Sequence, residues 1–155
     1  MLTFGSRYRI AADSATDEAC PVPCVFLAED NPGDVELLRL ALEENQVACE
    51  LFVACDGETA LAFIDEIGAE SMVCPALAIL DFNLPKRNGR EVLQHIRDCP
   101  ACDNIPVVIL SSSGSPKHMA ETAELGAIEY IRKPTSLEGF LQIGGMLKRF
   151  IVGPK

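Results

Sequence analysis

Five short runs of residues, most of them apolar, alternate along the chain with five segments of helical character, and this alternation limits the possible folds strongly. The runs are Val25–Ala28, Leu51–Val53, Leu77–Leu80, Val107–Leu110 and Glu129–Arg132. The helical segments span residues 34–44, 58–67, 89–98, 116–125 and 136–150. Because most runs are continuously apolar, we expect parallel strands with helices covering both faces of the sheet. The pattern predicts a doubly wound α/β fold with a five-stranded parallel sheet.

The length of 155 residues fits one domain, which we place at residues 23–151. Residues 1–22 are polar or small without a period, so we expect a flexible N-terminal arm, and residues 152–155 form a C-terminal tail. No apolar run reaches the ~20 residues of a membrane helix. Arg7 and Arg9 are not followed by the apolar stretch of a secretory signal, which predicts a cytoplasmic protein.

The charge and the cysteine content argue against a nucleic-acid-binding protein and against a disulfide-rich protein. The net charge of -10 repels phosphate backbones, so we expect no direct binding to nucleic acid. Without a secretion signal, the odd number of cysteines favours reduced core thiols over a disulfide framework. Cys99 and Cys102 have the spacing of a redox or zinc pair. They follow a helix and have no second pair nearby, so a structural role is favoured. The seven are Cys20, Cys24, Cys49, Cys55, Cys74, Cys99 and Cys102.

Polar residues whose side chains can take part in catalysis or bind a ligand follow four of the five runs. Glu29 and Asp30 follow the first run, Asp81 the third, Ser111 the fourth and Lys133 the fifth. The carboxyl ends of parallel strands meet at one edge of a sheet, where ligands of such folds bind. Each residue taken alone is more often a helix cap, a loop residue or a surface charge. Their joint occurrence predicts a single site.

The residue types indicate phosphate chemistry. Asp81 leaves a buried strand at its last position and is a candidate nucleophile. Three neighbouring carboxylates repel one another unless a cation intervenes, and Mg²⁺ prefers carboxylates, waters and phosphate oxygens. The backbone carbonyl of Asn83 is a further candidate ligand. Lys133 precedes Pro134, which fixes the turn, and its ammonium can pair with a phosphoryl oxygen.

These residues together resemble the receiver domains of two-component response regulators. The resemblance covers about residues 23–150 and rests on the acidic pair, on Asp81-Phe82-Asn83-Leu84-Pro85 followed by Gly89, on Ser111, on Tyr130 and on Lys133-Pro134. The separations also look like those of the family: 30 residues from Asp81 to Ser111 and 22 from Ser111 to Lys133. The resemblance implies a flavodoxin-like (βα)5 fold with strand order 2-1-3-4-5.

The resemblance further implies a signalling domain rather than an enzyme. Asp81 would accept a phosphoryl group from a phosphohistidine of a histidine kinase or a phosphotransfer protein. Mg²⁺ would be held by Asp30, Asp81 and the Asn83 carbonyl, with Glu29 acting through water. Ser111, which stands where many members carry threonine, and Lys133 would then bind the phosphoryl group, while Tyr130 would rotate inward as the switch.

The last helix carries more apolar surface than a core contact requires. Stepping about 100° per residue, its apolar residues span roughly 220° of the helical wheel, where a core stripe needs little more than about 100°. We expect a homodimer through this helix with the neighbouring strand and helix, and a monomer is the alternative. The apolar residues are Leu137, Phe140, Leu141, Ile143, Met146, Leu147, Phe150 and Ile151.

The first helix and the opening Glu-Asp-Asn-Pro-Gly-Asp suggest a partner. The opening is similar to that of regulators paired with phytochrome-type histidine kinases. Val35, Leu38 and Leu42 set the core face of the helix, and we place Leu37, Leu40 and Ala41 off that face. The resemblance implies that this helix docks the kinase.

Two other functions remain open at the level of sequence. A phosphohydrolase of the haloacid-dehalogenase class also uses a strand-terminal aspartate with Mg²⁺, but it needs an acid where this chain has Asn83. A flavodoxin-like binder needs a basic or Gly-rich phosphate loop, and the loop at residues 30–34 is acidic. His95 and His118 lie on predicted helices without charged neighbours and are expected to be surface or packing residues.

Overall fold

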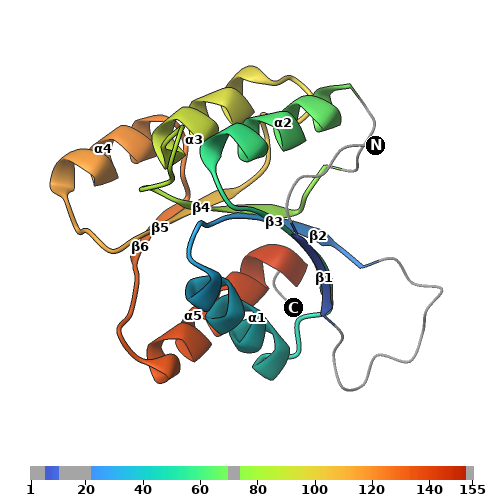
Figure 1. Cartoon of the computed structure of the whole chain (residues 1–155), viewed down its shortest axis with the longest axis vertical. Coiled ribbons are helices and arrows are strands. Elements are labelled where there is room, and N and C mark those ends of the chain that lie inside the picture. The colour runs from blue at the N-terminus through green and yellow to red at the C-terminus, as the bar shows by residue number, and fades with distance from the viewer. Residues whose placement is uncertain (1–5, 11–21, 70–73, 153–155) are drawn as a thin grey trace.

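The computed structural model describes residues 6–10, 22–69 and 74–152, which form one sheet between two layers of helices (Figure 1). The strands are β1 (Ser6–Ile10), β2 (Cys24–Ala28), β3 (Cys49–Ala54), β4 (Leu77–Asp81), β5 (Val107–Ser111) and β6 (Glu129–Arg132). The helices are α1 (Pro32–Glu44), α2 (Gly57–Gly68), α3 (Gly89–Asp98), α4 (Pro116–Glu124) and α5 (Leu137–Val152).

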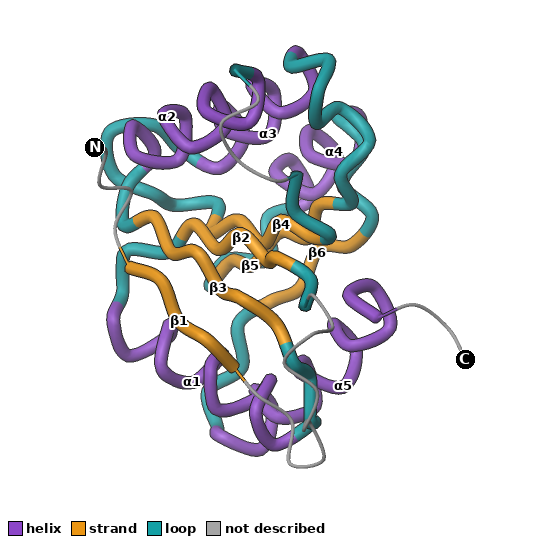
Figure 2. The backbone as a smooth tube through the Cα atoms, turned by 90° about the vertical axis from the view of Figure 1, so that its right-hand side faces the viewer, coloured by secondary structure: helices purple, strands orange, loops and turns teal. Residues whose placement is uncertain are grey.

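The sheet has the order β1-β3-β2-β4-β5-β6. The strands β2 to β6 are parallel and correspond to the five predicted runs, so the expected order 2-1-3-4-5 is confirmed. The strand count is wrong by one, because β1 pairs antiparallel with β3 at the edge (Figure 2). The central strands β4 and β5 are buried at every position, as continuous apolar runs require.

The strand β1 corrects the expectation of a flexible arm for residues 6–10. Ile10 is almost fully buried in the core, and Tyr8 packs against the same cluster. The Arg39 guanidinium of α1 lies 4.2 Å from the centre of the Tyr8 ring. Tyr8 and Ile10 therefore face the core, and the strand covers an edge of β3 that would otherwise be unpaired. The rest of the arm, residues 1–5 and 11–21, lies outside the described residues.

Helices cover both faces of the sheet, and each face has its own core. The helices α1 and α5 lie on one face, and α2, α3 and α4 lie on the other (Figures 1 and 2). On the second face Phe26 of β2 stacks on Phe63 of α2 with ring centroids 4.5 Å apart. This double cover leaves only the strand ends and the loops that follow them free for a site.

Polar side chains cap the first turns of several helices. Asn31 accepts hydrogen bonds from the backbone N–H groups of Gly33 and Asp34 at the start of α1. Asn88 and Glu91 form a reciprocal capping box at the start of α3. The Ser136 Oγ accepts a hydrogen bond from the Gly139 N–H at 3.1 Å at the start of α5. These caps fix the loops that carry the acidic pair and Asp81.

The helices α1 and α5 pack closely against each other, which changes two expectations. Ala41 is fully buried, and a Cβ added to Gly144 of α5 would lie 2.6 Å from the Ala41 carbonyl oxygen. Asn45 joins the pair by donating hydrogen bonds to the carbonyls of Ala41 and Leu141. The placement of Ala41 off the core face of α1 is therefore wrong. Part of the wide apolar face of α5 is also covered by α1 rather than free for a partner.

The helix α5 is the longest of the described elements, with 16 residues, and ends at Val152, one residue past the predicted domain boundary. Among the described residues, no helix has both the length and the apolar character needed to cross a membrane.

Candidate functional site

The strand register brings the predicted site residues to one edge of the sheet. Asp81 at the end of β4 pairs with Leu110 of β5, and Ser111 pairs with Arg132 of β6. Glu29 follows Ala28, which pairs with Leu80 next to Asp81. The strands end at nearly the same level, so the residues that follow them share the carboxyl edge.

Lys133 is the electrostatic centre of this edge. Its Nζ lies 2.9 Å from Glu29 Oε1, 2.9 Å from Asp34 Oδ2 and 3.0 Å from Asp81 Oδ2. Burial lowers the pKa of Lys133, but hydrogen bonds to these carboxylates more than offset it and leave the pKa raised. The ammonium is therefore held in its charged form between three acids, with only 13% of its side chain exposed.

Glu29 is the most perturbed acid of the site. It is only 1% exposed, and burial together with its hydrogen bond to Asp81 raises its pKa to about 8. Glu29 Oε1 forms no hydrogen bond of good geometry among the described residues, although Lys133 Nζ is within ion-pair distance. A buried carboxylate oxygen in this state is suited to a further positive partner.

Carboxylates that fit a hard divalent cation are present. Glu29, Asp30 and Asp81 each offer an oxygen, and these oxygens lie within 4.8 Å of one another. Asp30 is exposed and gives the cluster an open side. An all-oxygen set with access to water matches the preference of Mg²⁺. The residues present therefore fit such an ion.

The loop after β4 turns back over Asp81. The Asn83 backbone N–H donates to Asp81 Oδ1 at 3.0 Å, which places the Asn83 backbone beside this carboxylate. A Cβ added to Gly89 would lie 2.6 Å from the Asp81 carbonyl oxygen and 2.8 Å from Phe82 Cα. Only glycine fits here without a shift, so this position fixes the loop that carries Asp81.

Ser111 and Tyr130 converge on the loop after β5. Ser111 is fully buried, and its Oγ accepts from the Ser113 N–H at 3.1 Å, while the Lys133 N–H donates to the Ser111 carbonyl at 2.7 Å. Tyr130 is half-buried, and its hydroxyl donates to the Ser113 carbonyl at 2.9 Å. The described hydrogen bond of the Ser111 hydroxyl thus points to the loop rather than to Asp81.

Sequence reasoning missed several residues beside the acidic cluster. Asp34 was assigned to the start of the first helix, yet it contacts Lys133. Its place in the first turn of α1, four residues after Asp30, can be predicted from the sequence, but its contact with Lys133 cannot. Ser6 and Tyr8 of β1 also line a pocket of about 180 Å³ together with Glu29 and Asp30.

The histidines and cysteines contribute no further cluster among the described residues. His118 stacks on Phe82 with ring centroids 4.0 Å apart, as a packing residue would. His95 differs from expectation because its Nε2 lies 2.8 Å from Asp65 Oδ1. Burial raises the pKa of the Cys102 thiol to about 12, with a further contribution from a hydrogen bond with Cys99, which opposes thiolate formation.

Comparison with known proteins identifies the family. Residues 25–143 match the response regulator receiver domain. Response regulator Rcp1 of Synechocystis sp. is 34% identical over 129 residues, which cover 83% of this chain and 88% of that protein.

Solved structures agree with this match. The phosphorylated cyanobacterial phytochrome response regulator RcpA has a TM-score of 0.76 and 35% identity, over 84% of this chain and 94% of that one. The Mn²⁺-bound form of Rcp1 has a TM-score of 0.74 and 32% identity, over 83% and 93% of the two chains. The predicted family is confirmed over the phosphohydrolase and flavodoxin-like alternatives, and it is a family of signalling domains rather than enzymes. The chain belongs to the response regulator receiver domain family.

Proposed function

We propose that this protein accepts a phosphoryl group on Asp81 from the phosphohistidine of a histidine kinase or a phosphotransfer protein. The observation that carries the proposal is the position of the Asp81 carboxylate, with Oδ2 3.0 Å from Lys133 Nζ and Oδ1 beside the Asn83 N–H. Glu29, Asp30 and the Lys133 ammonium surround a nucleophile at the end of a buried strand. The similar structure of RcpA is described as phosphorylated, which supports the same chemistry here.

Each residue of the site has its own role in the phosphoryl transfer. An Asp81 oxygen attacks phosphorus in line as the bond to the imidazole nitrogen breaks, and the imidazole keeps the electron pair of that bond. Lys133 pairs with a phosphoryl oxygen, and positioning with charge neutralisation supplies most of the rate. Mg²⁺ held by Asp30, Asp81 and the Asn83 carbonyl, with Glu29 acting through water, would neutralise charge on the transferring group. The Mn²⁺-bound form of Rcp1 supports a divalent ion at this position.

The readout that we propose runs through the loop after β5. A phosphoryl group on Asp81 draws in the Ser111 hydroxyl and Lys133, which breaks the hydrogen bond from the Ser113 N–H to Ser111. The Tyr130 hydroxyl donates a hydrogen bond to the carbonyl of the same Ser113, so the Tyr130 ring follows the loop inward. A local change of charge thereby biases a two-state element at the surface near β6.

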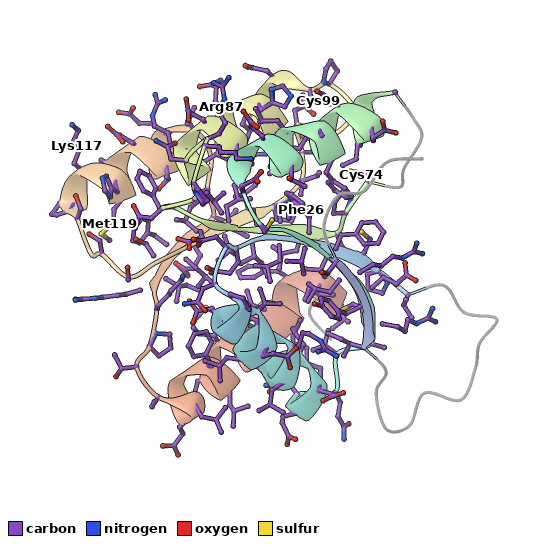
Figure 3. The ribbon with its side chains drawn as sticks, in the orientation of Figure 1. Phe26, Cys74, Arg87, Cys99, Lys117 and Met119 are labelled. Carbon is purple, nitrogen blue, oxygen red and sulfur yellow. The ribbon has the colours of Figure 1, made fainter. Side chains whose placement is uncertain are left out.

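The partners that we propose are a phytochrome-type histidine kinase upstream and a second copy of the chain. The similarity to phytochrome response regulators supports the first, and a cytoplasmic location goes with it. For the dimer, exposed Met119 of α4, Ile128 before β6 and Leu137 of α5 supply apolar surface, and Figure 3 shows Met119 at the periphery of the molecule. Sedimentation that finds only monomer at tens of micromolar, with and without a phosphoryl mimic, would exclude the dimer. The acidic net charge argues against direct nucleic-acid binding.

The central claim is tested by intact mass after incubation with Mg²⁺ and a small phosphodonor. The wild-type protein should gain the mass of one phosphoryl group, and Asp81→Asn should not. Asp98→Asn makes the same chemical change at an exposed helix end and should gain phosphate like the wild type. No gain in the wild type, or a gain that survives Asp81→Asn, would refute the proposal.

A further inference from the structure

We infer that Asp34 is a positioning residue, which holds the Lys133 ammonium over Asp81 while the other acids of the site engage the cation and the phosphoryl group. The contact between Asp34 and Lys133 is given by the structure, whereas its effect on phosphorylation rests on the proposed function. The three carboxylates on Lys133 Nζ come from three places in the chain. Glu29 follows β2, Asp81 ends β4, and Asp34 lies in the first turn of α1.

Asp34 differs from the other two acids because it is not part of the candidate metal site. Glu29 and Asp81 belong to the group of oxygens that could hold a metal ion, and Asp34 does not. When a cation and a phosphoryl group engage Glu29 and Asp81, Asp34 is the carboxylate that still faces Lys133. Its distance of 2.9 Å and its 20% exposed side chain place this pair under the surface, where solvent screens it less.

Lys133 needs such an anchor because of where it starts. It follows β6, and β5 lies between β6 and β4, so its side chain crosses a neighbouring strand to reach Asp81. The Lys133 backbone is fixed by the 2.7 Å bond from its N–H to the Ser111 carbonyl, but the side chain has four rotatable bonds. Fixing such a side chain in one rotamer costs conformational entropy. Asp34 lies beyond Asp81, on the side of β2 and α1. Its ion pair with Lys133 therefore favours the extended rotamer of the lysine before a phosphoryl group arrives.

The support for Asp34 is itself rigid. The Asn31 side chain accepts from the Gly33 and Asp34 N–H groups, and Pro32 begins the helix. Asp34 therefore has a fixed backbone on one side of the cluster, as Lys133 has on the other. The alternative is that Asp34 acts only on α1, where an acid in the first turn stabilises the helix through the helix dipole.

The first experiment measures the ion pair without any phosphorylation. Trace acetylation with acetic anhydride, followed by peptide mass analysis, reports the reactivity of Lys133 relative to Lys148 on α5 in the same sample. Asp34→Asn should raise the relative labelling of Lys133 by roughly tenfold, which corresponds to a coupling in the range seen for contacting charges. Asp34→Glu, which keeps the charge, should fall between it and the wild type. Glu43→Gln removes an exposed acid of the same helix and should change nothing.

The second experiment is a double-mutant cycle on the rate constant of phosphorylation. Asp34→Asn alone should slow it roughly tenfold, and it should have no further effect in the Lys133→Ala background. Unchanged Lys133 labelling, or multiplicative losses in the cycle, would overturn the role of Asp34. A wild-type protein that gains no phosphate would overturn the proposed function instead, and the labelling result would still decide whether Asp34 positions Lys133.

Discussion

The Tyr130 hydroxyl donates a hydrogen bond to the backbone carbonyl of Ser113 at 2.9 Å, and the Ser113 N–H donates to Ser111 Oγ at 3.1 Å. One residue of the loop after β5 is thus held from both sides, by the proposed switch aromatic and by the hydroxyl beside the site. The loop is a direct structural connection between Ser111 and Tyr130, which are 19 residues apart in the chain.

Tyr130→Phe removes this hydrogen bond and keeps the ring. We expect the free energy of unfolding to fall by about 0.5–1.5 kcal/mol, the net value of one hydrogen bond, in urea denaturation. Tyr8→Phe is the matched control, because it keeps the ring beside Arg39 and removes a hydroxyl that has no hydrogen bond among the described residues. Equal losses in the two variants would contradict a specific role of the Tyr130 hydroxyl.

The raised pKa of Glu29 predicts a pH dependence. Its pKa is about 8 in the folded protein against a usual value of 4.5, with burial as the main cause. The protonated carboxyl therefore favours the folded state, and this contribution is present below pH 4.5 and is lost as the pH rises through about 8. A divalent cation favours the ionised form, so its binding near pH 7 should release up to about one proton.

Proton release is measured by calorimetry of Mg²⁺ binding in two buffers with different enthalpies of ionisation. The wild type should show a heat that depends on the buffer, and the affinity for Mg²⁺ should rise with pH up to about 8. Glu29→Gln removes the titrating group, so the buffer dependence should disappear. A release of protons that is the same in both proteins would show that Glu29 is not its source.

Gly89→Ala tests the close approach of α3 to the backbone of Asp81. The added Cβ would lie 2.6 Å from the Asp81 carbonyl oxygen, so the loop has to shift at a cost of about 1–3 kcal/mol. The rate of phosphorylation should fall with it, because Asp81 moves relative to Lys133. Gly33→Ala, also in a first helical turn, would meet only Asn31 Oδ1 at 3.2 Å and should have a smaller effect on both measurements.

The sequence predicted those parts of the fold that depend on local pattern. The runs that form β4 and β5 are apolar throughout because both faces are covered, and this signal does not depend on the rest of the chain. The gathering of Asp81, Ser111 and Lys133 follows from parallel strands ending together. In contrast, only Ile10 of β1 is fully buried, so the mixed composition of that strand gave no period strong enough to reveal it.

Other contacts depend on how distant segments are oriented. The core face predicted for α1 assumes that the helix packs only against the sheet. The helix α5 is a second neighbour, and it buries Ala41 from another direction. The pair between Asp34 and Lys133 joins residues 99 positions apart and depends on the direction in which α1 leaves the site. Spacing along the chain carries no signal for such pairs.

The contact between α1 and α5 is tested by Gly144→Ala. Alanine favours a helix over glycine by about 1 kcal/mol, but here its Cβ would lie 2.6 Å from the Ala41 carbonyl oxygen and 2.7 Å from Asn45 Nδ2. We expect the clash to prevail and the free energy of unfolding to fall by about 1–3 kcal/mol. Gly145→Ala would meet the Asn45 side chain at 3.2 Å and should be near neutral. A stabilised Gly144→Ala protein would disprove the close packing.

The strand β1 is tested by Ile10→Ala, because Ile10 is its only fully buried residue and packs into the core next to α1 and α5. Loss of the buried side chain should lower the free energy of unfolding by about 2–5 kcal/mol in urea denaturation. Arg9→Ala removes an exposed side chain whose ion pair with Glu50 is 3.5 Å long, and it should cost less than about 1 kcal/mol. If both variants unfold like the wild type, β1 does not contribute to the folded domain, and the pocket that Ser6 and Tyr8 form beside Asp30 is not a stable part of the site.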